Sequence, residues 1–186
     1  MTTHPWHLRQ AARHYRLGGL IAYPTEAVYG LGCDPLNWDA VQRLLKLKQR
    51  SIEKGLILIA ADFNQLRSYI VEPAPQIMAP ILASWPGPAT WLLPAAPNLP
   101  KWLTGKHHTI AVRVTAHPLA ADLCRTCGSP LISTSANISG HRPAKSSLAL
   151  HSQFKRQIDF ILNGQTGTLK QPTPIQDAIS GKLIRS

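Results

Sequence analysis

The stretch Leu131-Ile132-Ser133-Thr134-Ser135-Ala136-Asn137-Ile138-Ser139-Gly140 begins with two aliphatic residues and then changes to small polar ones. This pattern predicts a buried strand that ends in an Asn/Ser/Gly turn. Because alternate side chains of a strand share a face, Ser133, Ser135 and Asn137 should project to one side, and the two residues between them to the other. Two hydroxyls and an amide in a row can bind a polar ligand, although an ordinary polar strand exit has the same composition.

The length and composition of the chain limit what surrounds this stretch. The 186 residues suffice for one sizeable domain and are few for two, and 44% of them are hydrophobic, as in globular proteins. No apolar run approaches the ~18 residues that would span a bilayer, and the first ten residues lack the hydrophobic segment of a signal peptide. The three cysteines are too few, and odd in number, for a disulfide framework. We therefore expect a soluble, cytoplasmic protein without membrane contact.

The net charge is strongly positive. Lysine and arginine number 20 against nine aspartates and glutamates, which gives a formal charge of +11. Such a charge favours nucleic acid or phosphorylated ligands, although a basic surface without a ligand is the alternative. The sequence contains no aromatic-rich RNA-binding run, GXXG clamp or zinc knuckle, so RNA binding lacks a specific motif.

Helical and strand-like patterns alternate along the whole chain. Helices are expected at 8–15, 38–45, 66–70, 77–85, 118–127 and 147–154. Strands are expected at 20–23, 55–60, 90–93, 109–114 and 158–162, with two short strands on either side of 180–181. This alternation predicts a single α/β domain over residues 1–186, with a twisted, mixed sheet flanked by helices.

Polar residues follow the first strand, where α/β proteins place ligand contacts. Thr25 and Glu26 come directly after Pro24, which ends that strand. Farther on, Gly30-x-Gly32 has no third glycine at the required place, so we reject a dinucleotide-binding loop.

Lys48 and Arg50 stand two residues apart where the second helix ends. If the chain is extended after Leu47, their side chains face the same way and could neutralise a polyphosphate, with a point charge from lysine and a bidentate fork from arginine. A solvated helix end would have the same sequence.

Arg113 lies on the predicted strand 109–114, on the same side as Thr109 and Ala111. A buried arginine needs an anionic partner. A structural carboxylate is the ordinary partner, but because the chain has only nine acidic residues, a bound carboxylate or phosphate becomes more credible.

The cysteines and histidines are not expected to bind metal. Cys124 and Cys127 form a CxxC at the C-terminal end of a helix, where the dipole disfavours a thiolate, and there is no second CxxC for zinc. We interpret them as structural thiols, and His107, His108 and His117 as surface or packing residues.

Five motifs in order resemble those of the YrdC-type threonylcarbamoyl-adenylate synthases, in their short bacterial form: Tyr23-Pro24-Thr25-Glu26, Lys48-x-Arg50, Trp85-Pro86-Gly87-Pro88, Ala111-Val112-Arg113 and Ser133-Thr134-Ser135-Ala136-Asn137. The resemblance covers essentially the whole chain and implies a YrdC-like fold with a concave basic cleft. It implies a nucleotidyltransferase that condenses L-threonine, bicarbonate (or CO2) and ATP into threonylcarbamoyl-adenylate and pyrophosphate, with Mg2+ held by the phosphates. Other proteins would then transfer the threonylcarbamoyl group to adenosine in tRNA.

The resemblance also implies a role for individual residues. It assigns L-threonine binding to Thr25, Arg113, Ser133 and Thr173. It assigns ATP binding to Lys48, Arg50, Thr109, Ser135, Asn137 and Arg185, with Lys48 and Arg50 as the catalytic cations. The chain departs from the family pattern at Ser51, where proline is usual, and at Thr173-Pro174-Ile175, where Ser-Thr-Ile/Val is usual. Glu26, the only acid in the motifs, is the sole candidate there for a general base.

Two other functions fit part of the sequence. A non-catalytic factor that binds tRNA or other RNA would explain the charge but not the set Thr25, Arg113 and Ser133. A carbamoyl-adenylate chemistry related to hydrogenase maturation comes with further domains that 186 residues cannot hold.

Overall fold

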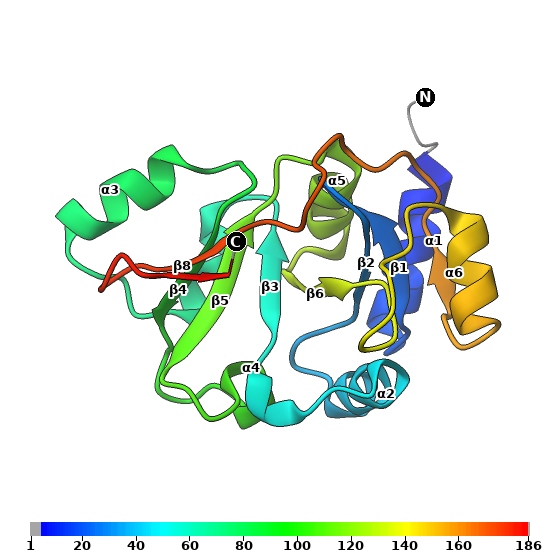
Figure 1. The fold of residues 1–186 in the computed structure, drawn as a ribbon, viewed down its shortest axis with the longest axis horizontal. Helices are drawn as coiled ribbons and strands as arrows, with labels where there is room; N and C mark the ends of the chain where they lie inside the picture. Colours follow the sequence, from blue (N-terminus) through cyan, green and yellow to red (C-terminus); the bar gives the residue numbers. More distant parts are fainter. Residues whose placement is uncertain (1–4, 186) are drawn as a thin grey trace.

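The computed structural model describes residues 5–185, and it contains one nine-stranded mixed sheet with helices on both faces (Figure 1). The strands lie in the order β7-β1-β2-β6-β3-β5-β4-β8-β9. The pairs β1–β7, β3–β5 and β4–β8 are parallel and the others antiparallel. The predicted α/β class with a mixed sheet is therefore confirmed. Within residues 5–185, no helix is long and apolar enough to cross a membrane.

The elements follow one another along the chain in this order: α1 (Pro5–Arg16), β1 (Ile21–Pro24), β2 (Tyr29–Gly32), α2 (Trp38–Lys48), η1 (Ile52–Lys54), β3 (Ile57–Ala60), η2 (Phe63–Tyr69), α3 (Pro75–Ala83), β4 (Thr90–Pro94), α4 (Lys101–Thr104), β5 (Thr109–Val114), α5 (Pro118–Cys127), β6 (Leu131–Ser135), α6 (Ser147–Phe154), β7 (Phe160–Ile161), β8 (Ile175–Asp177) and β9 (Leu183–Arg185).

Both faces of the sheet are buried, each in its own hydrophobic cluster. Alternate residues of β3 and β6 face opposite sides, so Ile59 and Leu131 belong to the cluster that includes residues of α1 and α5, while Leu58 and Ile132 belong to the cluster that includes residues of α2, α3 and α6. A strand covered on both faces has a continuous apolar sequence, which explains the run at 55–60.

Strand β6 joins the two halves of the sheet. Its first part, Leu131–Ser133, pairs with β3, and its last two residues, Thr134 and Ser135, pair with β2. The stretch from which the polar side chains were predicted to project therefore lies at the junction of the sheet.

The structure differs from the predicted elements in a few places. Strand β2 was not predicted, because its four residues include two glycines and no β-branched residue. A Cβ at Gly32 would lie 2.1 Å from the Ile132 carbonyl oxygen, so the close pairing requires glycine. The segment predicted as a helix at 66–70 is the 3-10 helix η2, and the short helix α4 was not predicted.

The end of α2 also differs from the prediction. Asn37 caps the helix as expected, since its side chain accepts a hydrogen bond from the Ala40 N–H. The chain is not extended after Leu47, however: the helix includes Lys48, and Gln49 adopts a left-handed conformation with φ 50°. The expected two-residue alternation of Lys48 and Arg50 is therefore wrong.

Candidate functional site

A cavity of about 270 Å3 lies where β6 meets its neighbours. Its lining includes most of the predicted site residues: Thr25, Arg50, Thr109, Arg113, Ser133, Ser135, Thr173 and Arg185. Because these residues come from segments far apart in the sequence, the fold assembles them into one site. Lys48 and Asn137 are the predicted site residues that do not line it.

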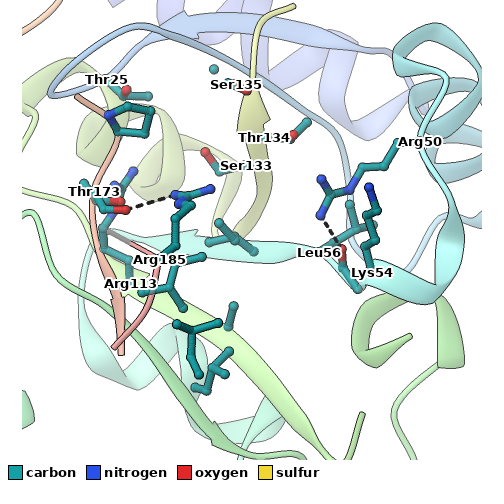
Figure 2. A pocket seen from close by; sticks show the side chains of 18 of the residues that line it. Thr25, Arg50, Lys54, Leu56, Arg113, Ser133, Thr134, Ser135, Thr173 and Arg185 are labelled. Carbon is teal, nitrogen blue, oxygen red and sulfur yellow. Dashed lines mark hydrogen bonds between the residues drawn. The ribbon is translucent and has the colours of Figure 1, made fainter. Parts of the chain in front are cut away.

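The cationic side chains of the cavity form two groups. Figure 2 shows Arg113 and Arg185 on one side, near Thr173, and Arg50 with Lys54 on the other. The described lining residues include no aspartate or glutamate. Lys54 was missed from the sequence, because an exposed lysine in the 3-10 helix η1 carries no local signal of a site.

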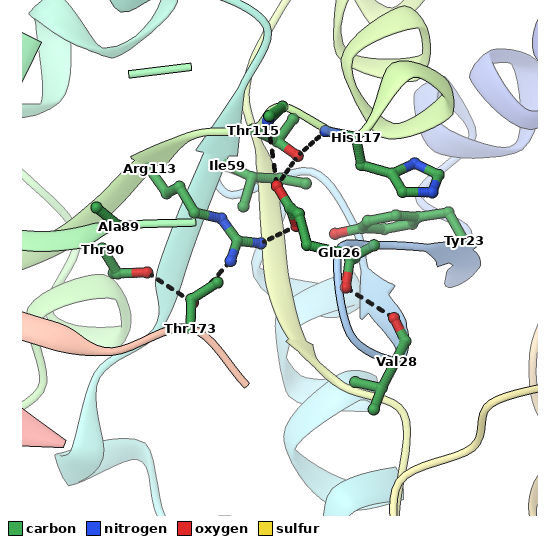
Figure 3. Close-up of polar contacts among 12 residues, drawn as sticks. Tyr23, Glu26, Val28, Ile59, Ala89, Thr90, Arg113, Thr115, His117 and Thr173 are labelled. Carbon is green, nitrogen blue, oxygen red and sulfur yellow. Dashed lines mark hydrogen bonds and ion pairs between the residues drawn. The ribbon is translucent and has the colours of Figure 1, made fainter. Parts of the chain in front are cut away.

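Arg113 has a structural carboxylate as its partner (Figure 3). Its Nη2 lies 3.4 Å from Glu26 Oε2, and its Nη1 donates a 2.7 Å hydrogen bond to Thr173 Oγ1. Thr173 Oγ1 also lies 3.1 Å from Thr90 Oγ1. The fold therefore supplies the structural carboxylate that was the alternative, and a bound anion as a further partner of Arg113 stays a prediction. Arg113 still lines the cavity, and its Nε has no hydrogen-bond partner among the described residues.

Glu26 is held as an anion. Its Oε1 accepts hydrogen bonds from Thr115 Oγ1, at 2.7 Å, and from the Ala116 N–H, at 3.1 Å. Burial by itself raises the pKa of the Glu26 carboxyl, but the charge of Arg113 and these hydrogen bonds together bring that pKa below its ordinary value. A carboxylate stabilised in this way is a poor proton acceptor, so the geometry favours a positioning role for Glu26 over a general-base role.

Arg185 and Arg50 are fixed by backbone carbonyls. Arg185 Nη2 donates to the Thr173 carbonyl at 3.0 Å, and Arg50 Nη2 donates to the Gly55 carbonyl at 3.0 Å. Burial lowers the pKa of both guanidinium groups, and for Arg185 the charges of Arg113 and Arg50 lower it further. Three mutually repelling cations around one cavity favour an anionic ligand between them.

Lys48 is bound to the backbone that leaves β6. Its ammonium group donates to the carbonyl oxygens of Ser135 and Asn137, the second at 2.7 Å. Burial, followed by the charge of Arg50, lowers the pKa of Lys48 to about 8. The Asn137 side chain bonds within the segment that follows β6: its Oδ1 accepts from Ser135 Oγ at 2.6 Å, and its Nδ2 donates to the His141 carbonyl at 2.8 Å. Both residues shape the end of β6.

The alternation predicted for β6 is partly observed. Ser133 and Ser135 line the cavity, and Ala136 is fully buried in the core on the opposite side. Thr134 also lines the cavity, contrary to the alternation.

The cysteines and histidines agree in part with their predicted structural roles. Cys124 is buried, its thiol donates to the Ile59 carbonyl at 3.6 Å, and burial raises its pKa. His107 lines the cavity, which the prediction of a surface or packing residue did not include. Within residues 5–185, no group of three or more His, Cys, Asp or Glu could hold a metal ion.

Comparisons with known proteins identify the family. Residues 14–186 match the Sua5/YciO/YrdC family, which carries the description "Telomere recombination". The chain belongs to this family. It is 54% identical over 181 residues to a protein of Stenotrophomonas maltophilia named threonylcarbamoyl-AMP synthase, with 96% of this chain and 97% of that protein covered.

Solved structures of the Sua5/YciO/YrdC family have the same fold. The P. abyssi Sua5 structure in complex with L-threonine is 34% identical with a TM-score of 0.89, and the match covers 95% of this chain and 52% of that one. E. coli YciO is 28% identical with a TM-score of 0.81, covering 96% and 88%. This chain therefore spans about half of Sua5 and most of YciO.

Proposed function

We propose that this protein is a threonylcarbamoyl-AMP synthase, a nucleotidyltransferase that uses L-threonine, bicarbonate or CO2, and ATP. The observation that carries the proposal is a cavity lined by both Arg113 and Arg50, in a chain that is 54% identical over nearly its full length to a protein of that name. The product would serve threonylcarbamoyladenosine formation in tRNA.

The side of the cavity around Arg113 suits the amino acid. The Arg113 guanidinium faces the cavity and would form an ion pair with the threonine carboxylate. The hydroxyls of Thr25, Ser133 and Thr173 lie on the same side and can bond its polar groups. Support for an amino-acid site comes from the Sua5 relative, whose structure contains L-threonine.

The side around Arg50 suits the nucleotide. Arg50 is fixed through Nη2 and would neutralise the polyphosphate, with Lys54 beside it. Ser135 and Thr109 line the cavity and could bond the nucleotide, while Arg185 lies near the amino-acid side and would neutralise charge between the two substrates. For Lys48 and Asn137, which do not line the cavity, we propose that they hold Ser135 in place.

The reaction needs positioning and charge neutralisation more than a nucleophilic side chain. The threonine amine adds to CO2 with loss of a proton, which gives a carbamate. A carbamate oxygen then attacks the α-phosphorus of ATP, and pyrophosphate leaves with the electrons of the broken P–O bond. The described residues offer no carboxylate cluster for Mg2+, so the proposed Mg2+ would be held by the phosphates, and we derive no step through it.

The test is pyrophosphate release from ATP and bicarbonate, with and without L-threonine. Release that depends on threonine is expected for the wild type, and Arg113→Gln should lose most of it, because the carboxylate loses its ion pair. The matched control is Arg142→Gln, since Arg142 is exposed and does not line the cavity. Pyrophosphate release by the wild type that does not depend on L-threonine would contradict the proposed function.

The remaining partners are proposals of the same kind. tRNA or other RNA would bind the basic surface, and separate proteins would transfer the threonylcarbamoyl group to tRNA in the cytoplasm. The alternative of a non-catalytic RNA-binding factor is supported by the charge of +11 and predicts RNA binding without threonine-dependent pyrophosphate release.

A further inference from the structure

A segment without helix or strand, which we name the strap (residues 163–174), connects β7 with β8. These strands lie far apart in the sheet, with β1, β2, β6, β3, β5 and β4 between them. The strap, orange to red in Figure 1, therefore crosses from one half of the molecule to the other. Two of its residues, Pro172 and Thr173, line the cavity.

The strap is attached to the loop that carries Thr25 and Glu26. The Gly167 N–H donates to the Thr25 carbonyl at 2.8 Å, and the Leu169 N–H donates to the Glu26 carbonyl at 3.1 Å. Before these contacts, the Gly164 backbone exchanges hydrogen bonds with the Tyr29 hydroxyl, at 2.6 and 3.1 Å. The loop and the strap are thus joined by backbone groups, whose position does not depend on side-chain rotamers.

The contact at Gly167 leaves no room for a side chain. A Cβ there would lie 2.4 Å from the Glu26 carbonyl oxygen and 2.9 Å from its carbonyl carbon and Cα. All three atoms belong to the backbone, so no rotation of a flexible side chain could relieve the overlap. Any other residue at 167 must move the strap and the loop apart.

The same two segments provide much of the amino-acid side of the cavity. The loop contributes Thr25, and through Glu26 it fixes the Arg113 guanidinium; the strap contributes Thr173, which accepts from Arg113 Nη1. A shift between strap and loop would change the spacing of Thr25 and Thr173 and the direction of Arg113. Arg50, which follows α2, and Ser135, on β6, make no hydrogen bond with the strap within residues 5–185.

We infer that Gly167 is a positioning residue for the amino-acid substrate, because its close contact with Glu26 sets the distance between the two segments that bind threonine. This inference rests on the proposed function and adds a residue that contacts neither substrate. It predicts that the contact matters more for threonine than for ATP, because the strap holds Thr173 and Arg113 directly, whereas its bond toward the residues assigned to ATP is the one from Arg185 to the Thr173 carbonyl.

The experiment compares Gly167→Ala with Thr168→Ala, an adjacent and exposed residue. Steady-state pyrophosphate release gives KM for each substrate, and calorimetry gives the affinity for L-threonine alone. Gly167→Ala should raise KM and Kd for L-threonine about tenfold or more, because small displacements of positioning groups are costly. Its KM for ATP should stay within about twofold of the wild-type value, and Thr168→Ala should behave as the wild type in both.

A second variant covers the case in which Gly167→Ala does not fold. Leu169→Pro removes the N–H that bonds the Glu26 carbonyl and adds no atom at Gly167, and it should also weaken threonine binding selectively. Unchanged threonine affinity in a folded variant, or equal losses for both substrates, would overturn the inference while leaving the proposed function intact. A wild type that does not bind threonine would overturn both.

Discussion

At the scale of single residues, the pair Glu26–Arg113 is the most deeply buried ion pair in residues 5–185, with side chains 10% and 7% exposed. Each group alone would be costly to bury. The pair therefore binds the loop after β1 to strand β5, at the place where the amino-acid substrate is proposed to bind.

Glu26→Gln should destabilise the protein by about 3 kcal/mol at pH 7, because it leaves Arg113 without its counter-charge. The folded-state pKa of Glu26 is lower than its ordinary value of 4.5, so the stabilisation by its charge is complete above pH 4.5 and is lost as the pH falls through the folded-state pKa. Urea unfolding at pH 7 and at pH 3.5 should thus show that the free energies of unfolding of the wild type and Glu26→Gln differ less at pH 3.5. The control is Asp122→Asn, in an ion pair whose side chains are half exposed, which should cost under about 1 kcal/mol. A gap of the same size at both pH values would contradict the role given to Glu26.

Lys48 should make the free energy of unfolding depend on pH in the alkaline range. Its pKa of about 8 in the folded protein lies below the ordinary 10.5, so the unfolded chain binds more protons between these values. The free energy of unfolding of the wild type should therefore rise relative to Lys48→Met, by on the order of 2 kcal/mol between pH 8 and pH 10. The exposed Lys46→Met, in the same helical turn, should show no such change relative to the wild type. A pH-independent difference for Lys48→Met would mean that the ammonium is not held in the buried position described.

At the scale of elements, the sequence of β6 predicted its hydroxyl face because an extended chain has one fixed alternation. The sequence could not predict that β6 pairs with β2 along one edge and with β3 along the other, since pairing depends on strands distant in the chain. Strand β2 could not be predicted for a related reason. It is defined by the close pairing of Gly32 with Ile132, and its own residues have low strand propensity.

The β6 exit carries a testable contrast between adjacent residues. Ser135→Ala should weaken ATP use by about tenfold, because it removes both a cavity hydroxyl and the hydrogen bond to Asn137. Thr134→Ala removes only a cavity hydroxyl for which no hydrogen bond is described, and it should have a smaller effect. KM for ATP in the pyrophosphate assay, with thermal unfolding as a check on folding, measures both. Equal increases in KM for ATP in the two variants would contradict the greater role given to Ser135 in ATP binding.

At the scale of the whole molecule, the site residues come from the loop after β1, the end of α2, strands β5 and β6, the strap and β9. No local pattern links these segments, and in the sequence only the ordered set of five family motifs points to most of them together. The ion pair of Arg113 with Glu26 and the backbone contact at Gly167 could not be predicted, because both depend on the packing of segments that are separate in the sequence.

The charge of +11 leads to a prediction about RNA. Arg9 and Arg13 are exposed on α1. If tRNA binds this face, the double variant Arg9→Gln/Arg13→Gln should bind tRNA more weakly. The slope of log affinity against log salt should also become smaller by about 1 to 2, because fewer counterions are released on binding when phosphate contacts are lost. Threonine-dependent pyrophosphate release should not change, since α1 contributes no residue to the cavity.

The control changes the same charge elsewhere, with Lys101→Gln/Lys106→Gln on the exposed segment at α4. Filter binding of one tRNA at several salt concentrations compares the two pairs. A smaller slope for the α1 pair alone would identify a defined RNA-binding face. Equal slopes for both pairs would mean that the net charge attracts RNA without a specific surface, and a wild-type slope near zero would exclude binding through phosphates altogether.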